Sequence, residues 1–222
     1  MYEYYNELKN SLLLRNMTRQ EVETCFKSFK KRVQEYKRGD IIFSQGDELK
    51  EVGIILSGIV AIGKADINGK DLTLYELTNG MTFGELFAYG EKILPNIYAV
   101  ARTKSRILHI DAGQFFDNSS NPERRAARKK MLSNLPKILV TKLLLLSHRV
   151  VHLVQGSVRG KILSLLNEEQ DIVRTFNKKN KLNKTNMAAF LNVDRATLSK
   201  ELALMRKEGL ITYDRHKIIL KI

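Results

Sequence analysis

The chain has 222 residues, 43% of them hydrophobic and 28% charged, which is typical of a globular protein of about two domains. Its single cysteine, Cys25, excludes an internal disulfide bond and any metal or iron–sulfur site that needs several thiolates from one chain. No run of residues reaches the ~18 apolar residues of a membrane span. Residues 1–10 also lack the pattern of a secretory signal. We therefore expect a cytoplasmic protein that does not enter a membrane.

The net charge of +14 lies entirely in the second half of the chain. Residues 1–120 carry 16 basic and 16 acidic side chains, so residues 121–222 hold all of the excess. Basic charge confined to one half indicates that this half meets a polyanion. Nucleic acid is favoured over anionic lipid, because the chain lacks the dense Lys/Arg block of membrane-surface segments.

The first 120 residues are predicted to form short helices followed by an antiparallel β-roll. Within residues 1–36, Asn10 is a candidate helix cap, and Thr18 with Glu21 has the spacing of a capping box. From Lys37 to about Asp117, glycines separate short apolar runs, as in an antiparallel barrel or roll. The predicted strands are 41–43, 54–56, 59–62, 72–77, 98–101 and 107–110, with Asn68-Gly69 as the strongest hairpin turn.

Residues 122–153 are predicted to be helical and to carry a heptad seam. The seam residues are Leu132, Leu139, Leu143, Leu146, Val150 and Leu153. Such a pattern favours two copies of a helix that bury one another. The alternative is a long helix lying on its own domain, which the polar flanks Lys142, His148, Arg149 and His152 disfavour. Pro136 is predicted to kink or restart the helix.

The last 67 residues (156–222) have the pattern of a compact helical module with two terminal strands. Ser157 is expected to cap a helix over 158–167, and Asn183 another that ends near Leu191. Asp194 is expected to cap a second helix after a three-residue turn, with Leu198, Leu202 and Met205 facing the core. The outward residues are Arg195, Ala196, Ser199, Lys200, Ala203 and Lys207. Small and cationic residues on one face favour insertion into a DNA major groove over an ordinary solvated helix pair. Strands are predicted at 210–213 and 218–222.

In order and spacing, these parts resemble the Crp/Fnr superfamily of bacterial transcription regulators. The segments that carry the resemblance are GDIIFSQGD (39–47), ILSG (55–58), GMTFGEL (80–86), 187–193 and DRATLSK (194–200). The resemblance implies an α+β fold. In this fold, residues 1–120 would form a cyclic-nucleotide-binding-type antiparallel β-roll, which is cupin- or jelly-roll-like. A dimerisation helix and hinge follow in 121–155, and a winged helix-turn-helix in 156–222.

The resemblance also implies roles in DNA binding. Arg195 matches the arginine that reads a guanine in this family, a contact suited to a bidentate guanidinium. Ser199 and Lys200 match positions that touch bases or nearby phosphates, and Lys184, Thr185 and Thr197 match backbone-contacting positions. Where many members have Glu, this chain has Ala196, which cannot accept a hydrogen bond from cytosine. We therefore expect a half-site that differs from the family consensus at that base pair.

The effector pocket implied by the resemblance departs from that of nucleotide-binding relatives. Gly84, Glu85 and Leu86 match the start of the phosphate cassette, and Tyr98 lies nearby. The expected Arg-Ser or Arg-Thr pair is replaced by Asn96 and Ile97, and the position of an adenine-contacting threonine is Leu146, next to Ser147. A cyclic phosphate would lose its charge-assisted partner, so cyclic AMP is not expected. Glu85 is then predicted to bond backbone amides at the turn.

Other triggers known in the family find little support in the sequence. One cysteine cannot supply a cysteine cluster. His109 lies between apolar residues of a predicted strand and is expected to be a satisfied core or surface residue rather than a haem ligand. His148 and His152, four apart, could share a metal across a two-fold axis, although such pairs are usually solvated. No cofactor is supported. The sequence leaves open whether the protein responds to an unidentified small-molecule effector or to no effector.

The sequence thus predicts a homodimeric regulator that binds a palindromic site in double-stranded DNA and is not an enzyme. Direct contact with RNA polymerase is what the resemblance implies for activators. The alternatives are a non-specific basic nucleic-acid-binding protein and an enzyme regulated by a nucleotide-binding domain. The enzyme is disfavoured because residues 121–222 contain no nucleophile–base arrangement, phosphate-binding glycine loop or metal triad.

Overall fold

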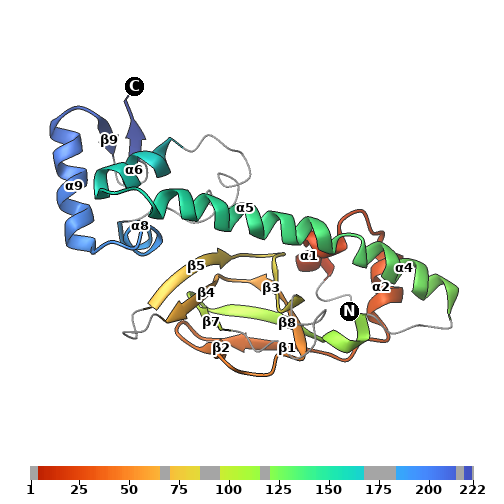
Figure 1. The fold of residues 1–222 in the computed structure, drawn as a ribbon. Helices are drawn as coiled ribbons and strands as arrows, with labels where there is room; N and C mark the ends of the chain where they lie inside the picture. The colour runs from red at the N-terminus through yellow and green to blue at the C-terminus, as the bar shows by residue number, and fades with distance from the viewer. Residues whose placement is uncertain are drawn as a thin grey trace. The chain divides into compact units, whose positions relative to one another are not determined.

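The computed structural model describes residues 5–65, 71–85, 96–115, 121–167, 184–213 and 218–221 (Figure 1). The chain divides into two compact units. The first comprises residues 1–71 and 76–142, and the second comprises residues 72–75 and 143–222. Among the described helices, none is long and apolar enough to cross a membrane.

The first unit contains the β-roll, apart from residues 72–75 of one strand, β5. Its strands are β1 (Lys31–Tyr36), β2 (Ile41–Phe43), β3 (Glu51–Ser57), β4 (Val60–Ala65), β5 (Asp71–Leu77), β6 (Thr82–Phe83), β7 (Tyr98–Ala101) and β8 (Ser105–Asp111). They form two four-stranded sheets, in the orders β1-β8-β3-β6 and β2-β7-β4-β5. The strand pairs with a described register are antiparallel. The predicted antiparallel roll is therefore confirmed, whereas the Asn68-Gly69 turn lies outside the described residues.

One strand of the roll begins earlier than the sequence predicts. We expected helices through residue 36, but Lys31–Tyr36 forms β1 and pairs with β8 over six residues, from Lys31 opposite Ile110 to Tyr36 opposite Ser105. The segment has a single buried residue, Tyr36, so the strand lacks the apolar alternation by which a strand is recognised in sequence. Pairing with a neighbouring strand, a tertiary effect, decides its conformation.

Helices cover one side of the roll. They are α1 (Tyr5–Leu8), a 3₁₀ helix (Leu12–Leu14), α2 (Arg19–Phe26) and α4 (Pro122–Leu132). The 3₁₀ helix is capped by Ser11, whose Oγ accepts from the amide of Leu13 at 3.3 Å, so the expected cap at Asn10 is wrong by one residue. Cys25 of α2 is fully buried, and this burial raises the pKa of its thiol to about 11.

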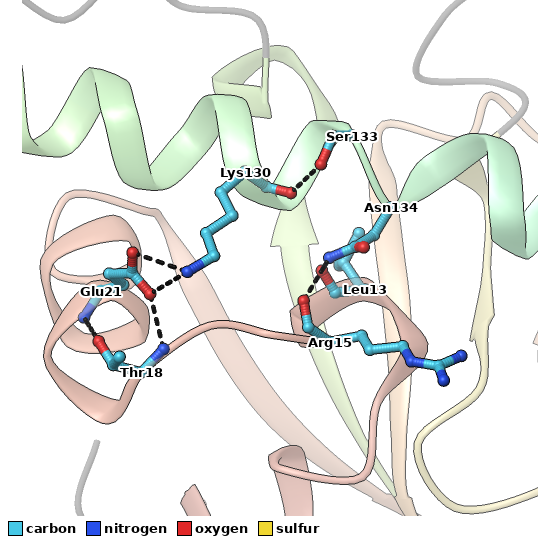
Figure 2. A network of polar contacts seen from close by, with 7 residues as sticks. All are labelled: Leu13, Arg15, Thr18, Glu21, Lys130, Ser133 and Asn134. Carbon is cyan, nitrogen blue, oxygen red and sulfur yellow. Dashed lines mark hydrogen bonds and ion pairs between the residues drawn. The ribbon is translucent and has the colours of Figure 1, made fainter.

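A polar network anchors the start of α2 to the end of α4 (Figure 2). The predicted capping box is confirmed: Thr18 Oγ1 accepts from the amide of Glu21, and Glu21 Oε2 accepts from the amide of Thr18 at 2.6 Å. Lys130 Nζ of α4 donates to both carboxylate oxygens of Glu21, at 3.0 and 2.9 Å. This hydrogen bond is the main cause of the lowered pKa of Glu21.

The predicted helical stretch is interrupted after α4. Asn134 lies at the break, is buried, and donates from Nδ2 to the carbonyl oxygens of Leu13 (3.1 Å) and Arg15 (2.9 Å) (Figure 2). The chain then restarts as α5 (Leu135–Leu153), with Pro136 in its first turn. Proline is tolerated there because the first amides of a helix have no intrahelical acceptor, so the predicted restart is confirmed.

The second unit contains the helical module. Its elements after α5 are α6 (Val158–Leu166), α8 (Lys184–Phe190), α9 (Arg195–Lys207), β9 (Ile211–Tyr213) and β10 (Ile218–Leu220). Ser157 caps α6 as predicted, accepting from the amide of Gly160 at 2.9 Å. The two strands pair antiparallel. The expected cap at Asn183 and the loop 214–217 lie outside the described residues.

Candidate nucleic-acid interface and effector pocket

Helix α9 begins where the sequence predicts. The carboxylate of Asp194 accepts from the amides of Ala196 (2.7 Å) and Thr197 (3.1 Å), so two free amides of the first turn are satisfied. Leu198, Leu202 and Met205 are fully buried, which confirms the predicted core stripe. They pack with residues of α6, α8 and β9 in one apolar cluster.

Glycine ends α9 and turns the chain into β9. Gly209 has φ +77°, a backbone conformation that other residues rarely adopt. Its amide donates to the carbonyl of Arg206 (3.1 Å), and the amide of Leu210 donates to that of Met205 (3.0 Å). This is the Schellman arrangement. Both ends of α9 are therefore fixed by local contacts.

The opposite face of α9 is open and basic. Arg195, Ala196, Thr197, Lys200, Ala203 and Lys207 are exposed, and Ser199 is half-buried. In the part of the chain that the structure describes, neither Arg195 nor Lys200 forms an ion pair. Three cations, Arg195, Lys200 and Lys207, and several small side chains thus face outward from one side of a helix that is capped and packed on the other.

A salt-bridge cluster removes acidic charge from this face. Arg159 of α6 donates to Glu201 of α9 (2.6 Å) and, through both Nη atoms, to Glu208 at its end (2.7 and 2.9 Å). These bonds, with Glu208 first, raise the pKa of Arg159. Glu201 is the only acidic residue within α9, so the pairing directs its charge toward α6. The role of Arg159 was not predicted from the sequence, because its partners are 42 and 49 residues away.

Helix α8 precedes α9 across the predicted short turn. Lys184 at its start is half-buried and Thr185 is exposed, whereas Met187 and Leu191 are buried. Asn192 in the turn has φ +49°, a conformation that asparagine tolerates better than most residues. The amide of Val193 donates to the carbonyl of Ala188 (3.0 Å), which closes the turn.

The heptad residues are distributed over two helices. Leu132 lies at the end of α4 and packs against the core of the first unit. On α5, Leu139, Leu146 and Leu153 are half-buried, whereas Leu143 and Val150 are exposed by 63% and 57%. Two further valines of this helix, Val140 and Val151, are more than half exposed, as is Val154 directly after it.

The polar flanks of α5 are not solvated, contrary to expectation. Lys142, Arg149 and His152 are all buried. The Arg149 guanidinium lies 5.0 Å from the centroid of the Phe190 ring, and His152 Nδ1 is 2.8 Å from Ser164 Oγ. The polar side of the helix therefore faces its own chain, and the apolar side faces outward.

The two histidines of α5 that could have formed a metal pair lie in different environments. His152 is buried against Ser164 and Phe190, whereas His148 is only half-buried. Among the described residues, no group of three or more His, Cys, Asp or Glu side chains could hold a metal ion.

His109 of β8 is a satisfied core residue, as predicted. Its Nδ1 lies 3.1 Å from Glu51 Oε2 and its Nε2 lies 3.1 Å from the Tyr36 hydroxyl. Because a carboxylate only accepts, Nδ1 carries the proton and Nε2 accepts from Tyr36. Burial, followed by the charge of Arg32, lowers the pKa of His109 to about 4.

Among the effector-pocket residues, Glu85 makes contacts that differ from those predicted. This side chain is 2% exposed and, among the residues that the structure describes, bonds two side chains and no backbone amide, so that prediction is wrong. Its Oε1 accepts from Lys142 Nζ of α5 and from Thr82 Oγ1, the latter at 3.3 Å. In the sequence, Lys142 was one of the polar flanks of the predicted helix, and its pairing with Glu85 was not predicted. The signal that could have indicated it is its place as the only charged residue within 138–147.

The remaining pocket positions are open or outside the described residues. Gly84 has φ +85°, and a Cβ there would lie 2.5 Å from the carbonyl oxygen of Glu51. Asn96 is exposed, and Ile97 and Tyr98 are half-buried, as is Leu146, whereas Ser147 is exposed. Leu86 lies outside the described residues.

Comparison with known proteins agrees with this architecture. The sequence model of the cyclic nucleotide-binding domain family matches residues 33–118. No curated protein sequence matches the chain. Among solved structures, the c-di-GMP-responsive global regulator CLP of Xanthomonas campestris is similar, with a TM-score of 0.68 and 17% identity over 92% of this chain and 100% of that one. The chain shares the fold of this regulator.

Two further solved structures share this fold. A transcriptional regulator assigned to the Crp/Fnr family from Eubacterium rectale has a TM-score of 0.61 and 15% identity, covering 94% of this chain and 92% of that one. A CooA variant from Carboxydothermus hydrogenoformans has a TM-score of 0.64 and 22% identity, covering 89% and 85%. The α+β fold class predicted from the sequence is thus confirmed.

Proposed function

We propose that this chain is a homodimeric transcription regulator of the Crp/Fnr type that binds a palindromic DNA site through α9. The observation that carries the proposal is the build of α9. Its amino end is capped by Asp194 and its inner stripe is fully buried, and its outer face carries, among small residues, Arg195 and Lys200, which form no ion pair with any residue that the structure describes. Such a helix can approach base edges closely and still donate hydrogen bonds to them.

The charge distribution supports the same proposal. The excess of basic over acidic residues lies after residue 120, and the acid of α9 is held by Arg159 on the α6 side. A duplex that approaches the outer face of α9 therefore meets cations, and the one carboxylate within the helix is already paired. Neutralising backbone phosphates releases counterions, so affinity is expected to fall steeply with salt.

The outer side of α5 supports a homodimer. Val140, Leu143, Val150 and Val154 are three, seven and four residues apart, which is the alternating three- and four-residue spacing of a two-helix seam with Ser147 at the remaining position, and all four are more than half exposed. Water contact with four such side chains on one stripe is unfavourable. A second copy of α5 would cover this stripe and would set two α9 helices at the spacing that a palindromic site requires.

In vitro site selection followed by gel-shift titration tests the DNA proposal. Arg195→Ala is expected to weaken binding to the selected site by about 1–3 kcal/mol and to relax one base position. Lys184→Ala is expected to weaken all duplexes alike, because a phosphate contact carries no sequence information. Lys37→Ala, an exposed lysine of the roll, is the matched control and should change nothing. Equal affinity of the wild-type protein for selected and scrambled duplexes would instead indicate a non-specific nucleic-acid-binding protein.

Sedimentation equilibrium tests the dimer. A Leu143→Glu/Val150→Glu variant is expected to be monomeric at concentrations where the wild type is dimeric, because both carboxylates would be buried in the seam. Ile41→Glu is the matched control, since Ile41 is equally exposed (64%) but lies on β2 of the roll. A monomeric wild type would overturn the proposal.

A further inference from the structure

Lys142 and Leu143 of α5 are placed against the usual burial preference of their residue types. Lys142 is the only charged residue between Ile138 and Ser147, and it is 7% exposed, whereas its neighbour Leu143 is 63% exposed. Lysine is rarely buried unless it is paired, and leucine is usually buried. The rotation of the helix therefore buries Lys142 in the first unit and leaves Leu143 exposed.

The partner of Lys142 is Glu85, in the segment that matches the start of the phosphate cassette of nucleotide-binding rolls. Lys142 Nζ donates to Glu85 Oε1, which also accepts from Thr82 Oγ1. Within the described residues, the other carboxylate oxygen, Oε2, is buried without a hydrogen-bond partner. A cavity with room for one water lies beside Lys142, lined in part by the hydroxyl-bearing Thr82 and Thr141.

Stability alone does not account for this ion pair. Removing two charges from water costs more than the pair regains unless further hydrogen bonds complete the geometry, and here Oε2 lacks one. Apolar residues of similar size would fill the space without that cost. A buried pair does, however, bond in only one arrangement, whereas apolar side chains tolerate several. It therefore specifies where α5 contacts the roll.

We propose that the Glu85–Lys142 ion pair takes the place of a bound effector. It holds the start of α5 against the roll, so the protein keeps its DNA-binding geometry without a small molecule. The proposal deepens the proposed function and rests on it. The acidic residue of the cassette is already occupied by a cation from the chain itself, and a cyclic nucleotide would have to displace Lys142 to reach it.

A double-mutant cycle on the full-length protein tests the pair without DNA. Lys142→Met leaves the Glu85 carboxylate buried and unpaired, so its melting temperature is expected to fall well below that of the wild type. The double variant Glu85→Met/Lys142→Met should recover to the wild-type value or above. Lys137→Met, the same change at an exposed position of α5, is the control. If the effects of Glu85→Met and Lys142→Met, each measured alone, add in the double variant, the pair does not couple and the proposal fails.

Gel-shift titration on the selected site then tests the role. The double apolar variant is expected to bind about tenfold more weakly than the wild type despite its stability. The reversed pair Glu85→Lys/Lys142→Glu should regain most of that loss. Wild-type affinity in the double apolar variant would reduce the pair to a packing contact. A rise of about tenfold in wild-type affinity on adding cyclic AMP or cyclic di-GMP would also overturn the proposal. Failure of the proposed function is distinct, since a wild type that selects no site leaves the melting cycle unaffected.

Discussion

The stability of the roll is expected to depend on pH through His109. The ring is 4% exposed, and burial together with the charge of Arg32 lowers its pKa from 6.5 to about 4. An unfolded chain therefore binds a proton on this ring at a pH where the folded chain does not. Stability is fully present above pH 6.5, the pKa of the unfolded ring, and is lost as the pH falls toward 4.

The size of the effect follows from the two pKa values. Linkage gives a loss of about 2 kcal/mol at about pH 5 and of about 3 kcal/mol at about pH 4, relative to neutral pH. Glu51, whose pKa is lowered by Arg32 and His109, adds a loss of the same sign at lower pH. Between about pH 6.5 and 5 the histidine is expected to dominate.

Urea unfolding followed by circular dichroism measures this loss, with one transition fitted for each unit. His109→Gln removes the titration but keeps a side chain that can bond Tyr36 and Glu51. The stability advantage of the wild-type roll over this variant is expected to shrink by about 2 kcal/mol between neutral pH and about pH 5. An advantage that stays constant over this range would refute the reasoning, as would a ring that titrates near 6.5 in the NMR spectrum of the folded protein.

Three further predictions concern single contacts. Asp194→Ala should destabilise the second unit by about 1–2 kcal/mol in urea unfolding, because two amides of α9 lose their acceptor, whereas Asp194→Asn should retain most of the stability. Gly84→Ala should lower the melting temperature of the roll more than Gly46→Ala, since both have φ +85° but only at Gly84 would a Cβ meet a backbone oxygen. Arg159→Met should weaken DNA binding at low salt, because two carboxylates lose their partner beside α9, and the loss should shrink as salt rises.

Local signals in the sequence were sufficient for several parts of the fold. The Thr18 capping box, the caps Ser157 and Asp194 and the restart at Pro136 depend on residues within one or two turns of each other. The inner stripe of α9 follows from helical periodicity. Such features are readable because each residue type has a conformational or hydrogen-bonding preference that acts over a few positions.

Contacts between distant segments could not be predicted. Strand β1 forms because β8 offers a partner about 75 residues later. Glu85 and Lys142 meet across 57 residues, and Arg159 reaches acids more than 40 residues away. The heptad pattern indicated that α5 has an apolar side. It did not reveal that the polar side would be buried within the chain, because periodicity sets the angle between faces and not the direction in which either points.

By itself, then, the sequence determined the class of fold, the order of its parts and the helix whose basic face we expect to read DNA. Tertiary structure alone decided which charges are buried and which are open. Arg195 and Lys200 stay exposed, whereas Lys142 and Arg149 turn inward. The physical reason is range: caps, turns and periodicity act within a few residues, but the environment of a charge depends on every segment that packs around it.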